Sequence, residues 1–202
     1  MTIGIILAAG CSTRMGSPKA LLPDPDGRPF VARLTRTFGA AGVTDIVIVT
    51  GIQHDAIVAA VATDRPTAYP SFFNNPKPER GQLSSLWIGL DAAAARPEVE
   101  AILVTPVDIP MVHASTIRQI VKVWQSQRAP VVRPAVGVRH GHPVLFDRTL
   151  FDELRRAPLD QGARAVVHAH ADRIVNVPVE DEGCLVDVDT PADYDALVRD
   201  AN

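Results

Sequence analysis

The sequence predicts a single α/β domain, a three-layer sandwich in which helices cover both faces of a mostly parallel sheet. Short runs rich in Val and Ile alternate with longer amphipathic segments, which is the pattern of strand, helix, strand units. A chain of 202 residues is long enough to bury one sizeable core. No internal repeat, low-complexity tract or linker interrupts the alternation, so we expect residues 1–202 to form one domain.

The first half of the chain follows this alternation in order. The apolar run at residues 3–9 predicts a buried first strand, and residues 29–42 predict a helix that ends at a glycine. Residues 45–51 predict the second strand, and residues 53–62 predict the helix that follows it. The prolines and asparagines of residues 66–82 predict an extended piece and an exposed loop.

The middle of the chain continues with a helix at residues 83–95, whose leucines and tryptophan fall at helical spacing. Residues 100–110 predict a buried strand that runs into an aspartate flanked by prolines. A helix is expected at residues 114–127, and one or two strands with a loop between them are expected at residues 129–147.

The last quarter of the chain predicts two helices, a strand and a final helix. The helices are expected at residues 149–157 and 161–171, and the strand at residues 173–179. Residues 182–190 predict a loop or short strand, and residues 191–201 predict a helix with a proline in its first turn.

The composition excludes several classes of protein. Hydrophobic residues make up 47% of the chain and charged residues 21%, the balance of an ordinary globular protein. A net charge of -3 gives no basic field for nucleic acid. Cys11 and Cys184 form no spaced pattern, so a reducing cytoplasm is the expected compartment. The amino terminus has no basic leader, and its apolar run is too short to span a membrane.

A loop of small residues leaves the first predicted strand at Ala8 and ends at Lys19. Ligands of open α/β sheets bind outside the carboxyl ends of the strands, so this loop lies where a ligand is expected. Gly10 and Gly16 allow the backbone to approach a ligand, and successive amide groups can converge on phosphate oxygens. Arg14 and Lys19 add positive charge. Together these features predict a triphosphate-binding loop.

Two common phosphate-binding loops do not fit this spacing. The dinucleotide fingerprint G-x-G-x-x-G needs closer glycines and an acidic residue at the end of the second strand, which here ends in V-T-G. A dinucleotide-dependent oxidoreductase is therefore not indicated. In a Walker loop the lysine directly follows the second glycine, whereas Lys19 comes two residues later. A tight strand-to-helix connection with solvated charges is the structural alternative.

Residues 7–22, L-A-A-G-C-S-T-R-M-G-S-P-K-A-L-L, resemble the signature L-A-A-G-x-S-x-R-M-G-x-x-K of nucleotidyltransferases. These enzymes transfer a nucleoside monophosphate from a triphosphate to a phosphorylated acceptor. The best-matching branch is the molybdenum cofactor cytidylyltransferase group, which is related to the guanylyltransferases of the same cofactor. Ala9, in place of a second glycine, favours the cytidylyl branch. The resemblance covers nearly the whole chain and implies a Rossmann-like fold of the nucleotide-diphospho-sugar transferase type.

A second segment, R-G-Q-L-S-S-L at residues 80–86, resembles the part of these enzymes that opens a helix beneath the nucleotide base. Gly81 and Gln82 can bond a base edge through the backbone and the side-chain amide. Ser84 or Ser85 is expected to cap the helix. The resemblance implies a nucleotide site made of Leu7, Ala8, Ala9, Gly10, Ser12, Arg14, Gly16, Lys19, Gly81, Gln82 and Ser85.

Carboxylates at two places are candidates for a magnesium site. Asp108 follows a buried strand, where a turn or cap aspartate is the structural alternative. Asp187 and Asp189 precede the last helix, where Asp189 or Thr190 followed by Pro191 could instead cap the helix. The resemblance implies that Asp108 and Asp189 are metal ligands, with Asp187 as the second choice to Asp189. Two H-x-H pairs offer zinc as a weaker alternative, because no cysteine lies near them.

The acceptor pocket is implied by two further segments. G-H-P-V-L-F at residues 141–146 resembles the pattern G-H-P-V-[LF]-F, and L-D-Q-G-A-R at residues 159–164 resembles G-D-x-G-A-R. Leu159 departs from the glycine of that pattern, and Ile109 departs from the D-Q-P of many relatives. Arg164 can grip the acceptor phosphate. The residues expected to bind the acceptor are His142, Pro143, Asp160, Gly162 and Arg164.

Our hypothesis from the sequence is a metal-dependent transfer of a nucleoside monophosphate, preferably CMP from CTP, to a molybdopterin-type acceptor. Arg14, Lys19 and Asp108 are the expected catalytic residues, and Asp108 and Asp189 would hold Mg²⁺. The rivals are a guanylyltransferase on the same cofactor, a cytidylyltransferase on a sugar or polyol phosphate, and a nucleotide-binding regulatory module without turnover. The expected partners are the triphosphate and a phosphorylated small molecule, not nucleic acid or membrane. The oligomeric state is not readable from these residues.

Overall fold

A single eight-stranded sheet organises the computed structural model of the chain, which describes residues 1–10, 12–64 and 66–199. The strands are β1 (Thr2–Ala8), β2 (Asp45–Thr50), β3 (Tyr69–Asn74), β4 (Ala101–Pro106), β5 (Val131–Val136), β6 (Arg139–His140), β7 (Val144–Asp147) and β8 (Ile174–Pro178). Their order in the sheet is β3-β2-β1-β4-β7-β5-β6, and β8 pairs with β5. Strands β3, β2, β1 and β4 are parallel to one another, whereas β7 runs antiparallel to β4 and β5.

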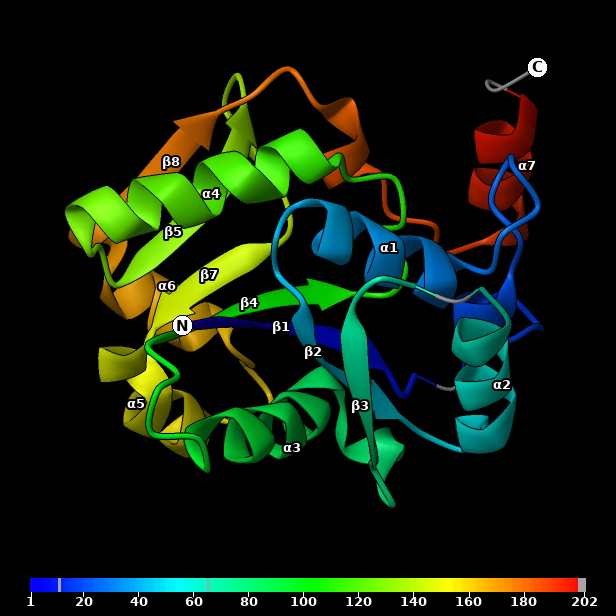
Figure 1. Cartoon of the computed structure of the whole chain (residues 1–202), viewed down its shortest axis with the longest axis horizontal. Coiled ribbons are helices and arrows are strands. Elements are labelled where there is room, and N and C mark those ends of the chain that lie inside the picture. Colours follow the sequence, from blue (N-terminus) through cyan, green and yellow to red (C-terminus); the bar gives the residue numbers. More distant parts are fainter. Residues whose placement is uncertain (11, 65, 200–202) are drawn as a thin grey trace.

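Helices cover both faces of this sheet. They are α1 (Phe30–Ala40), α2 (His54–Asp64), α3 (Gln82–Ala94), α4 (Ala114–Gln127), α5 (Phe151–Arg156), α6 (Arg164–Ala169) and α7 (Pro191–Arg199). Figure 1 shows α1 and α4 on one face and α3, α5 and α6 on the other, with α7 beside α1. The arrangement confirms the predicted α/β sandwich with a mostly parallel sheet.

The central strand β1 is buried on both faces, which explains its unbroken apolar sequence. Ile3 and Ile5 pack into the core beneath α3, and Ile6 packs into the core beneath α1 and α4. Its neighbours β2 and β4 run parallel to it, so the ends of the three strands meet at one edge of the sheet. The loop after β1 and the loop after β4 therefore leave the sheet side by side.

Some expected elements take a different form. Residues 129–147, expected as one or two strands, form the three strands β5, β6 and β7. The helix expected at residues 161–171 is shorter, because α6 begins only at Arg164, after a turn in which Gly162 has a φ of 66°. A left-handed glycine of this kind interrupts a helical path. Residues 182–185 form a 3₁₀ turn, which is compatible with the expected loop.

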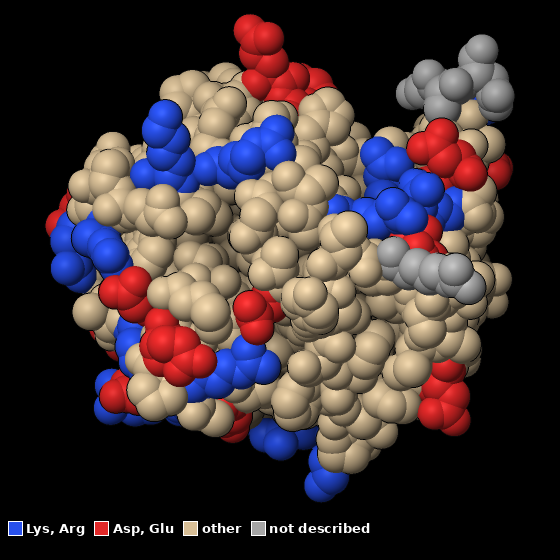
Figure 2. All heavy atoms as spheres, viewed as in Figure 1, with Lys and Arg blue, Asp and Glu red and all other residues tan. Residues whose placement is uncertain are grey.

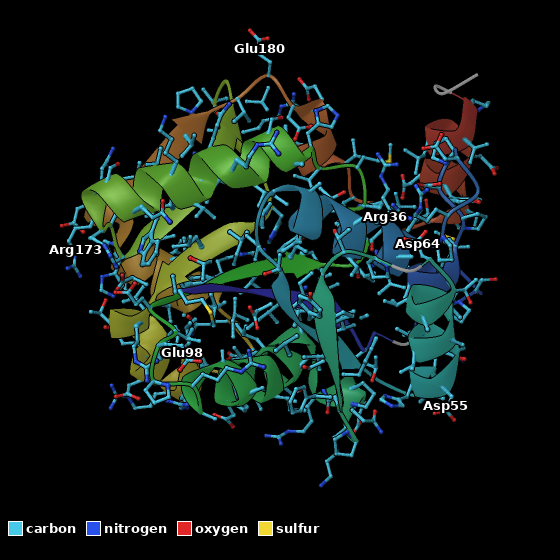
Figure 3. All side chains as sticks on the ribbon, in the orientation of Figure 1. Arg36, Asp55, Asp64, Glu98, Arg173 and Glu180 are labelled. Atoms are coloured by element: carbon cyan, nitrogen blue, oxygen red, sulfur yellow. The ribbon has the colours of Figure 1, made fainter. Side chains whose placement is uncertain are left out.

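Several charged side chains on the surface form ion pairs between elements. Asp64 at the end of α2 accepts a hydrogen bond from Arg36 of α1 and another from Arg28, at 2.9 Å, and Figure 3 shows Arg36 and Asp64 side by side. On the face drawn in Figure 2, basic and acidic side chains lie close to one another at the lower left and at the upper right. Within the described parts of the chain, the helices lack the length and apolar character needed to cross a membrane.

The close packing of α3 on β1 gives a test of the fold. A Cβ atom on Gly89 would lie 2.7 Å from Ile5 Cγ2. In an open helix position, replacing glycine by alanine stabilises a protein by about 1 kcal/mol. Here we expect Gly89→Ala to lower the free energy of unfolding by about 1–3 kcal/mol instead, because the added carbon overpacks the core. Urea denaturation measures the change. Gly10→Ala, where no atom lies within 4 Å of the added carbon, is the control, and a more stable Gly89→Ala protein would contradict this packing.

Candidate active site

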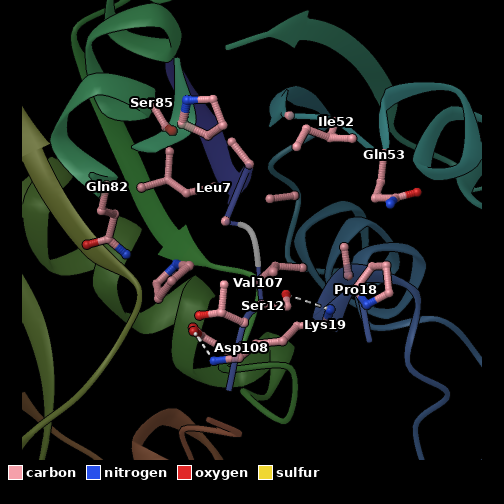
Figure 4. A pocket seen from close by; sticks show the side chains of 18 of the residues that line it. Leu7, Ser12, Pro18, Lys19, Ile52, Gln53, Gln82, Ser85, Val107 and Asp108 are labelled. Atoms are coloured by element: carbon pink, nitrogen blue, oxygen red, sulfur yellow. Dashed lines mark hydrogen bonds and ion pairs between the residues drawn. The ribbon is translucent and has the colours of Figure 1, made fainter. Parts of the chain in front are cut away.

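The loop between β1 and Lys19 is closed by its own hydrogen bonds. The Ser12 carbonyl accepts from the amides of Met15 and Gly16, both at 3.1 Å. The Ser12 hydroxyl oxygen accepts from the Lys19 amide at 3.0 Å, so it bonds within the loop. Gly16 has a φ of 71°, a conformation open to glycine at little steric cost. The loop is therefore a compact turn whose residues 12–14 and 16–19 line a cavity (Figure 4). Cys11 lies outside the described residues.

This cavity has a volume of about 620 Å³ and opens at the carboxyl ends of β1, β2 and β4. Gly81, Gln82 and Ser85 line it from the start of α3, opposite the loop (Figure 4). All of the residues predicted to bind the nucleotide line it: Leu7, Ala8, Ala9, Gly10, Ser12, Arg14, Gly16, Lys19, Gly81, Gln82 and Ser85. The structure thus brings together residues that are more than 70 positions apart in the chain.

Lys19 lies among carboxylates at one end of this cavity. Its ammonium donates to Asp108 Oδ2 at 3.1 Å and to Asp189 Oδ1. Arg14 forms a 2.8 Å ion pair with the other oxygen of Asp189. The side chain of Lys19 is 11% exposed, whereas that of Arg14 is 69% exposed. The three catalytic residues predicted from the sequence therefore meet around Asp189.

The protonation of these groups follows from their contacts. Burial by itself lowers the pKa of Lys19, but the hydrogen bonds and charges of Asp189 and Asp108 outweigh it and raise the pKa. The hydrogen bond from Lys19, aided by the charges of Lys19 and Arg14, lowers the pKa of Asp189 against the opposing effect of partial burial. Lys19 is therefore an ammonium and Asp189 a carboxylate at neutral pH.

Asp108, Asp187 and Asp189 form the group of side chains best suited to a metal ion among the described residues. One ligand oxygen from each lies within 4.8 Å of the others. Desolvation of the carboxyl group, together with the negative charges of Asp108 and Asp189, raises the pKa of Asp187 to about 6, although the residue as a whole is exposed. Three carboxylate oxygens so close together suit a divalent ion. The ammonium of Lys19 lies beside two of these carboxylates, where such an ion would also lie. Histidines do not complete a comparable group within the described residues.

Backbone contacts hold the two carboxylate segments together. The Asp108 carbonyl accepts a 2.9 Å hydrogen bond from the amide of Val188, which is fully buried. Asp193 in the first turn of α7 accepts from the Thr190 amide at 2.7 Å and from the Asp189 amide at 3.1 Å. Of the two residues that could cap this helix, Thr190 does so, because its hydroxyl oxygen accepts from the Asp193 amide at 3.3 Å, whereas the Asp189 side chain pairs with Lys19 and Arg14. The Asp189 carboxylate is left to bind cations.

The expectation that Ser84 or Ser85 caps α3 is also wrong. The helix begins at Gln82 and its N-cap is Gly81, which makes no side-chain bond. Both serine hydroxyls lie in the first turn and accept hydrogen bonds from the side-chain Nδ2 of Asn75, at 3.0 and 2.9 Å. This pairing links the start of α3 to the loop after β3, and no local sequence signal indicates it.

A second chamber of about 530 Å³ adjoins the first, and Leu7, Gln82 and Pro106 line both. Four of the five residues predicted to bind the acceptor line it: His142, Asp160, Gly162 and Arg164. Pro143 is buried behind His142, in a cis peptide bond with it, and is not among the lining residues.

Gly141 and His142, which line the second chamber, contact the segment that leads to Asp187 and Asp189. The His142 amide donates to the Cys184 carbonyl at 2.9 Å. A Cβ atom on Gly141 would lie 2.4 Å from that carbonyl oxygen, so only glycine allows this approach. Burial raises the pKa of the Cys184 thiol to about 11, which makes it unreactive at neutral pH.

Several lining residues were not found from the sequence. Gly51, Ile52 and Gln53, after β2, line the first cavity. Arg133 and His140 line the second chamber from β5 and β6. Their place in the second half of the sheet depends on the antiparallel strand β7, which separates β5 from β4. The strand order brings Arg133 and His140 to the second chamber, and the alternation of apolar runs in the sequence does not reveal that order.

The sequence matches the model of one protein family, the MobA-like NTP transferase domain, over residues 4–174. The chain belongs to the MobA-like NTP transferase domain family. Membership confirms the resemblance drawn from residues 7–22, and the family and its named relatives indicate a nucleotidyltransferase enzyme.

Relatives of this MobA-like chain carry more than one name. A "Probable molybdenum cofactor guanylyltransferase" of Mycolicibacterium paratuberculosis is 30% identical over 97% of this chain and 94% of its own. The "Molybdenum cofactor cytidylyltransferase" of Escherichia coli is 25% identical over 94% and 92%, and the "Nicotine blue oxidoreductase" of Paenarthrobacter nicotinovorans 29% over 93% and 91%. Another relative, from Rhodopirellula baltica, is 30% identical over 64% of this chain, and the match spans 59% of that relative.

Solved structures share the fold over the whole length. A crystal structure of Rv0371c from Mycobacterium tuberculosis is 29% identical and covers 98% of both chains, with a TM-score of 0.81. A structure of Rv0371c described as a complex with manganese covers 98% of both chains, at 27% identity and a TM-score of 0.75. These likenesses support the Rossmann-like nucleotidyltransferase fold, and the second agrees with the carboxylate group as a candidate for a divalent metal.

The position of Lys19 leads to a prediction about metal affinity. An ammonium in contact with Asp108 and Asp189 opposes the binding of a second cation to the same carboxylates. We therefore expect Lys19→Met to bind Mn²⁺ more tightly than the wild type when nucleotide is absent, as measured by calorimetric titration. Lys122→Met, at an exposed position on α4, should match the wild type. Weaker or unchanged Mn²⁺ binding by Lys19→Met would contradict the competition.

Proposed function

We propose that the protein transfers a nucleoside monophosphate, CMP from CTP in the first instance, to a phosphorylated acceptor of the molybdopterin type, with release of pyrophosphate. The observation that carries this proposal is the junction of two cavities at Leu7, Gln82 and Pro106. A triphosphate in the first cavity and an acceptor in the second can meet there. We further propose that residues 1–202 act as one nucleotidyltransferase domain in the cytoplasm.

The first cavity suits a triphosphate. Its loop offers backbone amides, and Arg14 and Lys19 supply positive charge. Contacts to the triphosphate would draw Arg14 and Lys19 away from Asp189, and Asp189 would then need another cation. In this proposal Gly81 and Gln82 bind the base edge, while Ser85 stays with Asn75 and fixes the start of α3.

The acceptor oxygen needs no proton acceptor. A phosphate monoester has its second pKa at about 6, so it is largely dianionic at neutral pH and nucleophilic as it stands. Its oxygen forms a bond to the α-phosphorus, the bond from that phosphorus to the bridging oxygen breaks, and pyrophosphate leaves with the electron pair. Lys19 and Arg14 stabilise the charge on the triphosphate oxygens, and positioning supplies much of the rate.

The carboxylate group fits a divalent ion, and we propose Mg²⁺ as that ion. Asp108 and Asp189 would hold it, with Asp187 close enough to contribute an oxygen. Mg²⁺ prefers one or two carboxylates together with water and phosphate oxygens, which is the donor set available here. When bound it would offset negative charge on the triphosphate.

The names of the relatives leave a choice of nucleotide and of reaction. Ala9 favours CTP over GTP, and the molybdenum cofactor is the acceptor that the relatives' names support best. The oxidoreductase name of one relative makes a dinucleotide the alternative ligand. The loop disfavours it, because its glycines, Gly10 and Gly16, are too far apart for the G-x-G-x-x-G fingerprint.

Ligand-dependent stability tests this proposal without the acceptor. At a concentration about 100 times its dissociation constant, a bound ligand stabilises the folded state by about 2.7 kcal/mol. We expect CTP with Mg²⁺ to raise the melting temperature more than GTP, ATP, UTP or NADPH. Asp108→Asn should lose the part of the stabilisation that depends on Mg²⁺.

Asp172→Asn is the matched control, because Asp172 is an exposed aspartate outside both cavities, and this variant should respond like the wild type. A larger shift with GTP would move the proposal to the guanylyl branch. A shift with NADPH alone, or with no nucleotide, would overturn nucleotidyl transfer at this site.

A further inference from the structure

Basic side chains line the second chamber without counter-ions. Arg133 comes from β5, His140 from β6, and Arg164 and His168 from α6. Among the described lining residues, Asp160 is the one carboxylate, and it forms no ion pair with either arginine. The chamber therefore has an excess of positive charge that the nucleotide and metal roles leave unused.

The contacts of these groups are few. Arg133 Nε donates to Asn176 Oδ1 at 2.8 Å, and no carboxylate pairs with this guanidinium among the described residues. The side chains of His140, Arg164 and His168 make no hydrogen bond or ion pair among the described residues. Burial lowers the pKa of Arg133, and burial together with the charge of Arg133 lowers the pKa of His140. A partly buried guanidinium that lacks a counter-ion is a ready partner for an oxyanion.

The place of this basic group separates it from the chemistry. In the proposed reaction, the acceptor phosphate must reach the α-phosphorus in the first cavity, next to Lys19 and Asp108. Asp108 and Asp189 line that cavity and do not line the second chamber. A phosphate that reacts in the first cavity therefore leaves Arg133 and Arg164, which line only the second chamber, to another group of the acceptor.

We propose that the acceptor carries a second anionic group, an oxyanion several bonds from the reacting phosphate, and that Arg133 and Arg164 bind it in the second chamber. This inference rests on the proposed function, because it takes the second chamber as the acceptor site. Two anchoring points would fix the direction of the acceptor, with its phosphate towards the junction at Leu7, Gln82 and Pro106. Neutral phosphorylated alcohols would then be poor acceptors.

A series of ω-phosphonocarboxylates of increasing chain length tests the proposal by calorimetric titration. The protein is first saturated with Mg²⁺ and α,β-methylene CTP, which cannot transfer its nucleotide. We expect the affinity to reach a maximum at one chain length, and to exceed that of the alkylphosphonate of equal length by about tenfold, the gain expected from one charge-assisted pair. Arg133→Met and Arg164→Met should each reduce this gain, and the double variant should remove it.

Arg156→Met is the matched control, because Arg156 is an exposed arginine outside both cavities, and it should keep the full gain. Arg164 is exposed, so its variant keeps the test valid even where Arg133→Met folds poorly. A flat length series, or arginine variants that behave like Arg156→Met, would overturn the second-anion site while α,β-methylene CTP still binds. Failure of the nucleotide itself to bind would overturn the proposed function instead, together with this inference.

Discussion

The contact of Lys19 with Asp108 and Asp189 is the interaction on which the site depends. It joins three chain segments, the loop after β1, the loop after β4 and the segment before α7. Like charges from Asp108, Asp187 and Asp189 would repel one another at this spacing, and the ammonium of Lys19, together with the Arg14 guanidinium on Asp189, offsets that repulsion. The parallel pairing of β1 with β4 makes the contact possible, because both strands end at the same edge of the sheet.

The segment before α7 supports both cavities at once. Its Val188 amide binds the Asp108 carbonyl, and four residues earlier its Cys184 carbonyl accepts the His142 amide. Thr190 and Asp193 together close the start of α7, and so leave the Asp189 carboxylate free for cations. A shift of this segment would therefore move the carboxylates of the first cavity together with His142 of the second chamber. This is a physical route by which ligand binding in one cavity could affect the other.

The sequence predicted the parts of the fold that rest on local patterns. The buried run of β1 and the helix α4, at residues 114–127 as expected, follow from periodicity alone. The loop with Lys19 and the place of Asp108 after a buried strand were predicted from local patterns, but the contact between these two residues appears only in the structure. Arg133 and His140 were missed, because their place depends on the antiparallel insertion of β7 between β4 and β5. The bond of the Asn75 side chain to Ser84 was missed for a similar reason, since it joins the loop after β3 to the first turn of α3 with no shared sequence pattern.

Anomalous diffraction from crystals grown with Mn²⁺ and α,β-methylene CTP would test the assignment of the two cavities most directly. The manganese peak should lie between Asp108 and Asp189, with Lys19 turned from the carboxylates towards the triphosphate along residues 8–19. The cytosine should lie beside Gly81 and Gln82, and the second chamber should remain open to an acceptor. A triphosphate in the second chamber, or manganese bound by a different set of side chains, would contradict this assignment.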